Sequence, residues 1–191
     1  MRFVSSGALL VLCGLPAFSQ GPFIAQQQHI KHYANSLAPY VVSPQEIVDR
    51  MLLLADPKPN ELVYDLGSGD GRILITAVQR YHAKAVGIEI SESLAKSTAE
   101  RIQRLGLQNE ARVINGDFMH VDLSPADIVT MYLATDANEM LRPSLEKQLK
   151  PGARVVSHEY AIPGWKPKLV DKEFPESHHH VIYLYEVPKK K

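Results

Sequence analysis

Apolar positions follow two alternating rhythms along most of the chain. Short apolar runs bounded by turn residues predict strands, and stretches with apolar residues every three to four positions predict amphipathic helices. The predicted strands cover 62–66, 83–90, 111–117, 126–133 and 153–160. The predicted helices cover 43–55, 72–81, 91–105 and 136–150. Strands that alternate with helices predict a parallel sheet with helices on both faces, an α/β fold.

Several helix ends carry their own signals. Ser43 is expected to cap the first helix, with Pro44 at the first helical position and Glu46 completing a capping box. Ser91 is expected to cap the third helix, and Gly106 to close it.

The C-terminal part of the chain breaks the alternation. Pro143 is expected to kink the fourth helix or to start a second helical segment. Beyond the fifth strand, "KLVDKEF" and "HHHVIYLYEV" are two strand-like runs with no helix between them. Such a pair predicts an antiparallel β-hairpin at one edge of the sheet.

Composition limits the classes of function. The chain has 191 residues, 45% of them hydrophobic, which suits one globular domain with a full core. Its formal net charge is zero, whereas nucleic-acid binding usually needs a basic excess. We therefore expect no nucleic-acid partner. The final "PKKK" reads as a solvated basic tail.

The first residues have the pattern of a secretory signal peptide. A charged start at Arg2 precedes the apolar stretch "GALLVLCGLPAF" and small residues at Ala17 and Ser19. This pattern predicts a signal over 1–19 and export to the periplasm or the medium. The apolar run is too short for a stable membrane span in the mature chain. The alternative is an ordinary apolar N-terminal helix on a cytoplasmic protein.

The stretch "LVYDLGSGDGRILI" carries the most specific signal in the chain. Glycine occupies every second position from Gly67 to Gly71 between a predicted strand and a predicted helix. The dinucleotide-binding motif G-x-G-x-x-G, counted from Gly67, requires a glycine at position 72, where this chain has Arg72. The phosphate-loop motif G-x-x-x-x-G-K-[ST] does not match either. What remains is an acidic residue, Asp65, that enters a glycine turn. An ordinary tight turn is the alternative.

Three acidic residues follow three successive predicted strands. Asp65 enters the glycine turn, Glu89 ends the second strand, and Asp117 ends the third. Ligands of open parallel sheets bind beyond the carboxyl ends of the strands, so these acids are expected to share one crevice. Carboxylates repel a pyrophosphate but attract a ligand that carries an ammonium and a sulfonium group. S-adenosyl-L-methionine is such a ligand.

This ligand assigns roles to the neighbouring residues. Glu89 is expected to accept both ribose hydroxyls, and Asp117 to accept from the adenine amine. Phe118 or Met119 and Ile90 are expected to flank the adenine ring. The cofactor-binding residues expected from these patterns are Asp65, Gly67, Ser68, Gly69, Glu89, Ile90, Asp117 and Phe118.

The chain resembles the class I S-adenosylmethionine-dependent methyltransferases, which have a Rossmann-like seven-stranded sheet with a C-terminal antiparallel hairpin. More narrowly, the chain is similar to the lysine methyltransferases of the mitochondrial ATP synthase c-subunit and adenine nucleotide translocase, and more distantly to the Dot1-type enzymes. The segments that carry this similarity are "APYVVSPQEIVDRML", "YLATDANEMLRPSLEKQLKPGARVVSHEY" and "IPGWKP". The resemblance implies a protein lysine as acceptor. It also implies that Tyr40, Val41 and Ser43 fold over the methionine end of the cofactor.

The resemblance and the strand pattern together set the domain boundaries. A lead-in segment over 20–42 is expected to cover part of the cofactor site. The methyltransferase domain is expected over 43–188 and the basic tail over 189–191.

Methyl transfer needs an acceptor channel rather than a covalent nucleophile. Tyr132, at the end of the fourth strand, is the first candidate to line that channel, and Tyr40 is the second. Core packing is the alternative for Tyr132. His158 and Glu159, at the end of the fifth strand, are further acceptor-side candidates.

The run of histidines at 178–180 does not predict a metal site. Adjacent strand residues point to opposite faces, so at most two of the three imidazoles can share a ligand.

Three other functions stay open. The acceptor can be a small molecule, or the chain can be a catalytically silent cofactor-binding protein of the cell envelope, because the methyl donor is made in the cytosol. A nicotinamide oxidoreductase is the third, although Arg72 and Asp65 both weigh against it.

Overall fold

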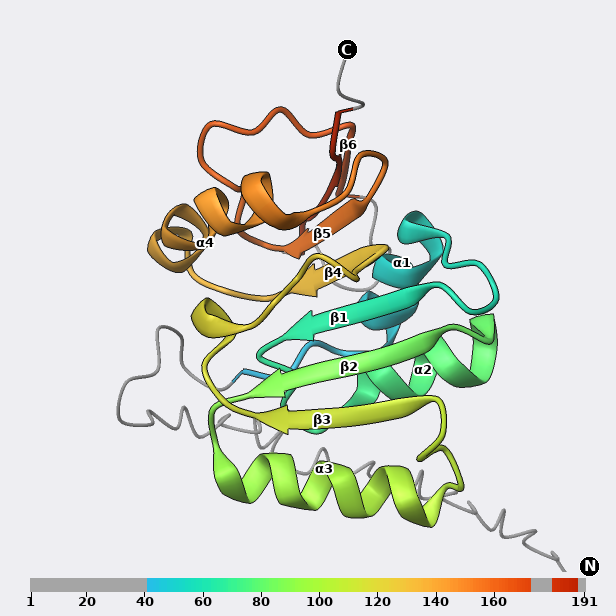
Figure 1. Ribbon diagram of the computed structural model, residues 1–191. Helices are drawn as coiled ribbons and strands as arrows, with labels where there is room; N and C mark the ends of the chain where they lie inside the picture. Colours follow the sequence, from blue (N-terminus) through green and yellow to red (C-terminus); the bar gives the residue numbers. More distant parts are fainter. Residues whose placement is uncertain (1–40, 173–179, 189–191) are drawn as a thin grey trace, which may run out of the picture.

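The computed structural model describes residues 41–172 and 180–188, and a seven-stranded sheet forms its centre (Figure 1). The strands lie in the order β3-β2-β1-β4-β5-β7-β6. The strands are β1 (Leu62–Leu66), β2 (Lys84–Glu89), β3 (Ala111–Asn115), β4 (Ile128–Met131), β5 (Arg154–His158), β6 (Leu169–Asp171) and β7 (Ile182–Glu186). The helices are α1 (Gln45–Ala55), α2 (Arg72–Tyr81), α3 (Glu92–Arg104), a 3-10 turn η1 (Phe118–His120) and α4 (Thr135–Gln148).

The strand pairing confirms the predicted sheet. β1 to β5 pair in parallel, and β7 is antiparallel to both β5 and β6. β7 lies between β5 and β6, so the last strand of the chain is not at the edge. This order places the beginning of β7 beside the end of β5, because Ile182 pairs with His158.

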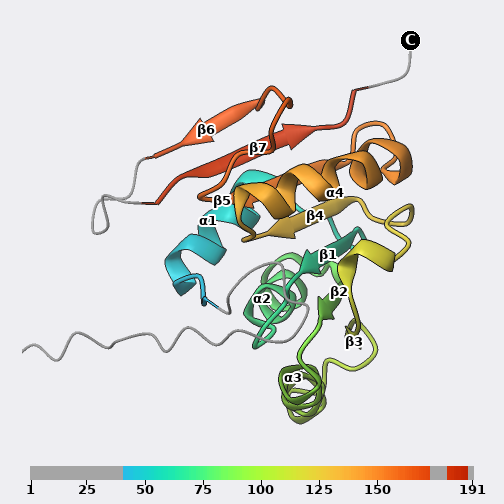
Figure 2. The ribbon, with the colours of Figure 1, turned by 90° about the vertical axis from the view of Figure 1, so that its left-hand side faces the viewer.

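Helices cover both faces of the sheet (Figure 2). One apolar core lies beneath α1, α2 and one side of α3, where Met51, Leu74 and Ile102 are buried. The other lies beneath α4, where Leu141 and Leu145 pack with Met131 of β4. The two layers hold the strand ends in fixed positions.

Two predictions about the helices are wrong. Helix α1 begins at Gln45 with Pro44 in the N-cap position, and within the described residues no side chain caps it. The Ser43 hydroxyl lies instead 2.9 Å from Nδ1 of His158. Helix α4 runs through Pro143 as one element, so Pro143 does not start a second helical segment, and the expected kink stays a prediction. Proline has no N–H for the carbonyl of Glu139, but Glu139 is exposed, so water can pair with that carbonyl.

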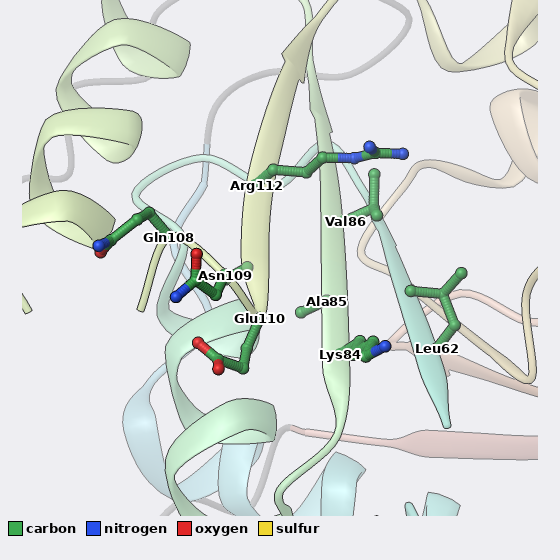
Figure 3. Close-up of a pocket in the computed structure, with 9 residues that line it drawn as sticks. Leu62, Lys84, Ala85, Val86, Gln108, Asn109, Glu110 and Arg112 are labelled. Carbon is green, nitrogen blue, oxygen red and sulfur yellow. The ribbon is translucent and has the colours of Figure 1, made fainter. Parts of the chain in front are cut away.

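The two edges of the parallel strands differ in character. β1 to β5 all end at the same edge, where their arrowheads lie in Figure 1. A pocket of about 310 Å³ opens at the opposite edge, around Leu62, Lys84 and Ala111, the first residues of their strands (Figure 3). Open α/β sheets bind ligands at the carboxyl edge, so this pocket is not the expected cofactor site.

Among the described residues, we find no helix with the length and apolar character needed to cross a membrane.

Candidate functional site: the carboxyl edge of the sheet

The turn between β1 and α2 is built on glycines with left-handed backbones. Gly67, Gly69 and Gly71 have φ angles of 80°, 52° and 74°. Gly71 is required for a second reason, because a Cβ there would lie 2.5 Å from Cγ2 of Thr98 in α3. The turn is therefore held against α3, and Thr98 also donates a hydrogen bond of 2.7 Å to the carbonyl of Gly69.

The turn also packs closely on β2. The amides of Gly67 and Ser68 donate to the carbonyl of Ile88 at 2.9 and 3.0 Å. A Cβ on Gly87 would lie 2.4 Å from Oγ of Ser68, so the Ser68 side chain is directed at β2. Its buried hydroxyl has no hydrogen-bond partner among the described residues. Gly87 was not predicted as part of the site, and its only signal is a glycine inside a strand.

Asp65 lies at the end of β1 with its side chain almost fully buried. Thr130 is its neighbour in register on β4 and donates a hydrogen bond of 2.8 Å to Oδ1. Burial raises the pKa of Asp65 to about 7, the Thr130 hydrogen bond opposes this shift, and the carboxylates of Glu89 and Asp70 add to it. A cation beside Asp65 would relieve this penalty.

Glu89 links the glycine turn to the start of α3. Its Oε2 accepts from the amide of Gly69 at 2.8 Å, and its Oε1 accepts from the amide of Ser91 at 2.9 Å. Each carboxylate oxygen has a second lone pair, so the backbone fixes the carboxylate while it can still accept from two hydroxyls. Ser91 also caps α3, accepting from the Leu94 amide at 3.4 Å.

Asp70, a residue inside the turn, has a structural role. It forms an ion pair of 2.8 Å with Arg72 and a longer one of 3.6 Å with Arg101. Burial would raise the pKa of Asp70, but the hydrogen bonds and charges of these arginines hold it below its usual value. Nη1 of Arg72 also donates to the carbonyl of Ser43 at 2.6 Å. Arg72 thus ties the segment before α1 to the glycine turn.

The β3 side of the edge holds the residues expected around adenine. Asp117 caps η1 by accepting from the Met119 amide at 2.8 Å, and its side chain remains 38% exposed. Phe118 and Ile90 are both half-buried. Asn115 was not predicted, yet its amide donates to the carbonyl of Glu89 at 2.9 Å and so joins β3 to the end of β2.

The β4 and β5 ends carry a second polar cluster. Tyr132 follows β4, and its ring centroid lies 4.0 Å from that of His158 and 6.2 Å from that of Tyr160. Burial raises the pKa of the Tyr132 phenol, and the carboxylate of Glu159 adds to the shift, so the hydroxyl stays protonated.

His158 is fully buried at the centre of this cluster. Burial lowers its pKa to about 3, with a further contribution from His180, so its imidazole is neutral.

The structure thus brings Asp65, Glu89 and the glycine turn together and places Tyr132 at the same edge of the sheet. Val41 is half-buried at the start of the described residues, whereas Tyr40 lies outside them. So do the signal over 1–19 and most of the lead-in over 20–42.

The acidic edge fits a cationic nucleoside. Asp65 is a buried carboxylate whose nearby charges are also negative. The two arginines beside the turn, Arg72 of α2 and Arg101 of α3, are paired with Asp70. A diphosphate would meet repulsion here, whereas an ammonium or sulfonium group would be attracted. The residues therefore fit S-adenosylmethionine, which supplies the methyl group when it is bound.

Comparison with known proteins agrees with the cofactor that these residues fit. The ANTKMT methyltransferase domain matches residues 65–169. A protein-lysine N-methyltransferase of Saccharolobus islandicus is 47% identical over 154 residues, which span 80% of this chain and 96% of that protein. The adenine nucleotide translocase lysine N-methyltransferase of Mus musculus is 33% identical over 69% of this chain, which spans only 57% of the mouse protein.

A solved structure gives the same fold with a bound cofactor product. An RNA methyltransferase of Salinibacter ruber, in complex with S-adenosyl-L-homocysteine, is 38% identical with a TM-score of 0.74, covering 79% of this chain and 96% of that one. The family resemblance and the seven-stranded fold are therefore confirmed. The chain belongs to the ANTKMT methyltransferase domain family of S-adenosylmethionine-dependent methyltransferases.

Proposed function

We propose that this enzyme transfers the methyl group of S-adenosylmethionine to the side-chain nitrogen of a protein lysine. The observation that carries the proposal is the acidic carboxyl edge, where Asp65 and Glu89 surround the glycine turn. The acceptor is supported by the name and the 47% identity of the Saccharolobus islandicus relative, which the chain spans almost completely.

The reaction is an in-line displacement in which the neutral lysine amine attacks the methyl carbon, the bond from carbon to the sulfonium breaks and S-adenosylhomocysteine leaves. The methylated ammonium then loses a proton to solvent, so the protein contributes orientation and electrostatics. Two backbone amides fix the Glu89 carboxylate, which would hold the ribose hydroxyls of the bound cofactor. Tyr132 is the proposed acceptor-side residue. Its protonated hydroxyl donates a hydrogen bond to the Glu159 carboxylate. The phenolic oxygen can therefore accept a hydrogen bond from the incoming amine.

RNA is the second candidate acceptor, because the Salinibacter ruber neighbour is named an RNA methyltransferase. The formal net charge of zero favours protein over RNA, since phosphate contacts require a basic surface. A small-molecule acceptor and a silent cofactor-binding role are the remaining alternatives.

A transfer assay with radiolabelled S-adenosylmethionine decides among these acceptors. The purified chain is incubated in parallel with protein fractions, RNA and small-molecule extract of its own cells, and labelled protein is digested for mass spectrometry. We expect methyl-lysine in the protein fraction. Label in RNA alone contradicts the proposed acceptor, and cofactor binding without transfer to any fraction favours the silent role.

We also propose that residues 1–19 direct export of the chain. The charged start and apolar stretch support this proposal. N-terminal sequencing of the native protein tests it, with a new N-terminus near Gln20 as the expected result. An intact Met1 on a cytoplasmic protein would refute export.

A further inference from the structure

Three potential ligand atoms converge where β5 ends and β7 begins. His158 Nε2 and His180 Nδ1 are 3.0 Å apart, and Oε1 of Glu159 lies 2.7 Å from His180 Nδ1 and 3.5 Å from His158 Nε2. All three atoms belong to side chains that can bind a metal ion. His158 and Glu159 are adjacent in the chain, and His180 lies 22 positions from His158.

The triangle formed by these atoms has the size of a metal-ligand set. Its sides of 2.7, 3.0 and 3.5 Å give a circumscribed radius of about 1.8 Å, and zinc bonds to nitrogen and oxygen are about 2.0–2.2 Å long. An ion about 1 Å out of the plane therefore lies at a normal bond length from all three atoms. Two histidines and one glutamate form a familiar zinc donor set.

The backbone explains how neighbouring residues reach the same ion. Side chains of adjacent strand residues normally point to opposite faces. Glu159 follows the last residue of β5 and has a φ of 62°, an uncommon left-handed conformation for a non-glycine residue. This departure from the strand brings its carboxylate within 3.5 Å of the His158 imidazole.

Ser43 holds the buried histidine in orientation. Its hydroxyl lies 2.9 Å from Nδ1 of His158, the ring nitrogen that does not face the cluster. Metal-binding histidines usually have a hydrogen-bond partner on the second nitrogen, which fixes the ring and its tautomer. With the proton on Nδ1, His158 presents a lone pair at Nε2 to the ion.

We propose that His158, Glu159 and His180 bind one divalent transition metal ion, with zinc as the fitting ion. The ion links the end of β5 to the beginning of β7, and through Ser43 to the segment before α1. This site is separate from the glycine turn, and its test does not depend on methyl transfer. The alternative is a hydrogen-bonded cluster in which one proton occupies the centre.

Metal titration of the untagged full-length chain tests the site. After treatment with a chelator and dialysis, zinc chloride is titrated by calorimetry, and cobalt chloride is added separately to monitor visible absorption. We expect saturable binding of one Zn²⁺ per chain with a Kd of about 10 µM or tighter. We also expect Co²⁺ absorption typical of a low-coordinate nitrogen and oxygen site, displaced by zinc.

Three variants distinguish zinc binding at this site from zinc binding at other histidines. Glu159→Gln and His180→Asn remove one ligand each from partly exposed positions, and each should weaken zinc binding at least ten-fold. His82→Asn, an exposed histidine with a φ of 55° at the end of α2, is the matched control and should bind like the wild type. Circular dichroism melting confirms that each variant is folded.

Two outcomes overturn the proposal. One is the absence of saturable zinc binding up to about 100 µM zinc, a concentration well above the Kd expected of a three-ligand site. The other is zinc binding that Glu159→Gln and His180→Asn leave unchanged, because the ion would then bind elsewhere, for example at His178 and His179.

Discussion

Replacing Asp65 by asparagine should strengthen the fold and weaken cofactor binding. The pKa of Asp65 is raised to about 7 from 3.8 because the carboxyl is buried. At about 1.4 kcal/mol per pKa unit, the ionised form carries a penalty of about 4 kcal/mol above pH 7. Asparagine keeps an oxygen for the Thr130 hydroxyl but adds an N–H that needs a partner. We therefore expect a net gain of about 2 kcal/mol at pH 8.

The sign of the pH dependence follows from the same shift. Between about pH 4 and pH 7 the folded state holds a proton on Asp65 that the unfolded state has released. The stabilisation that this proton provides is complete below the unfolded pKa and is lost as the pH rises through 7. Thermal or urea unfolding of the cofactor-free protein from pH 5 to pH 8 should show this decline, and Asp65→Asn should remove it.

Cofactor binding should show the opposite trend, because the ammonium group prefers the ionised carboxylate. The Kd for S-adenosylhomocysteine, measured by calorimetry, should be about ten-fold weaker at pH 6 than at pH 8. Asp65→Asn should weaken binding at pH 8 by about ten- to one-hundred-fold and flatten the profile. Glu110→Gln, at an exposed position lining the pocket at the opposite edge, is the control. A wild-type Kd that is equal at both pH values would refute this reasoning.

Three further substitutions test the turn and the acceptor side. Arg72→Gln removes the link to the segment before α1 and should weaken S-adenosylhomocysteine binding about five- to ten-fold, whereas Arg80→Gln on the same helix should not. Equal affinities in calorimetry would show that the link does not contribute to cofactor binding. Gly71→Ala should lower the free energy of unfolding in urea by about 2–4 kcal/mol. Adding Thr98→Ser, which deletes the opposing methyl group but keeps the hydroxyl, should restore part of that loss. If it restores none, the 2.5 Å approach of the new Cβ to Cγ2 of Thr98 is not the cause. Tyr132→Phe should lower kcat about ten-fold with an unchanged Kd for S-adenosylhomocysteine, and an unchanged kcat would assign the ring to packing alone.

Local patterns were enough to predict most of the fold. β1 and α2 have the predicted bounds, because apolar periodicity and the glycine turn are features of neighbouring residues. The approach of Asp65 and Glu89 also follows from topology, since parallel neighbouring strands end at one edge. The Thr130 partner of Asp65 required the β1–β4 register, which the sequence does not specify.

Contacts between distant segments could not be predicted. Ser43 looked like a helix cap because its sequence neighbours suit one, but its hydroxyl contacts His158, 115 positions away. The cluster of His158, Glu159 and His180 depends on the insertion of β7 between β5 and β6 and on one left-handed residue. Neither feature leaves a periodic signal.

Ser43 makes two contacts that face different parts of the molecule. Its carbonyl accepts from Arg72 beside the glycine turn, and its hydroxyl contacts His158 on the acceptor side. One residue therefore connects two neighbouring sites. A ligand that moves the His158 imidazole can therefore change the affinity for the cofactor. By thermodynamic linkage, cofactor binding must then change the affinity for that ligand by the same factor.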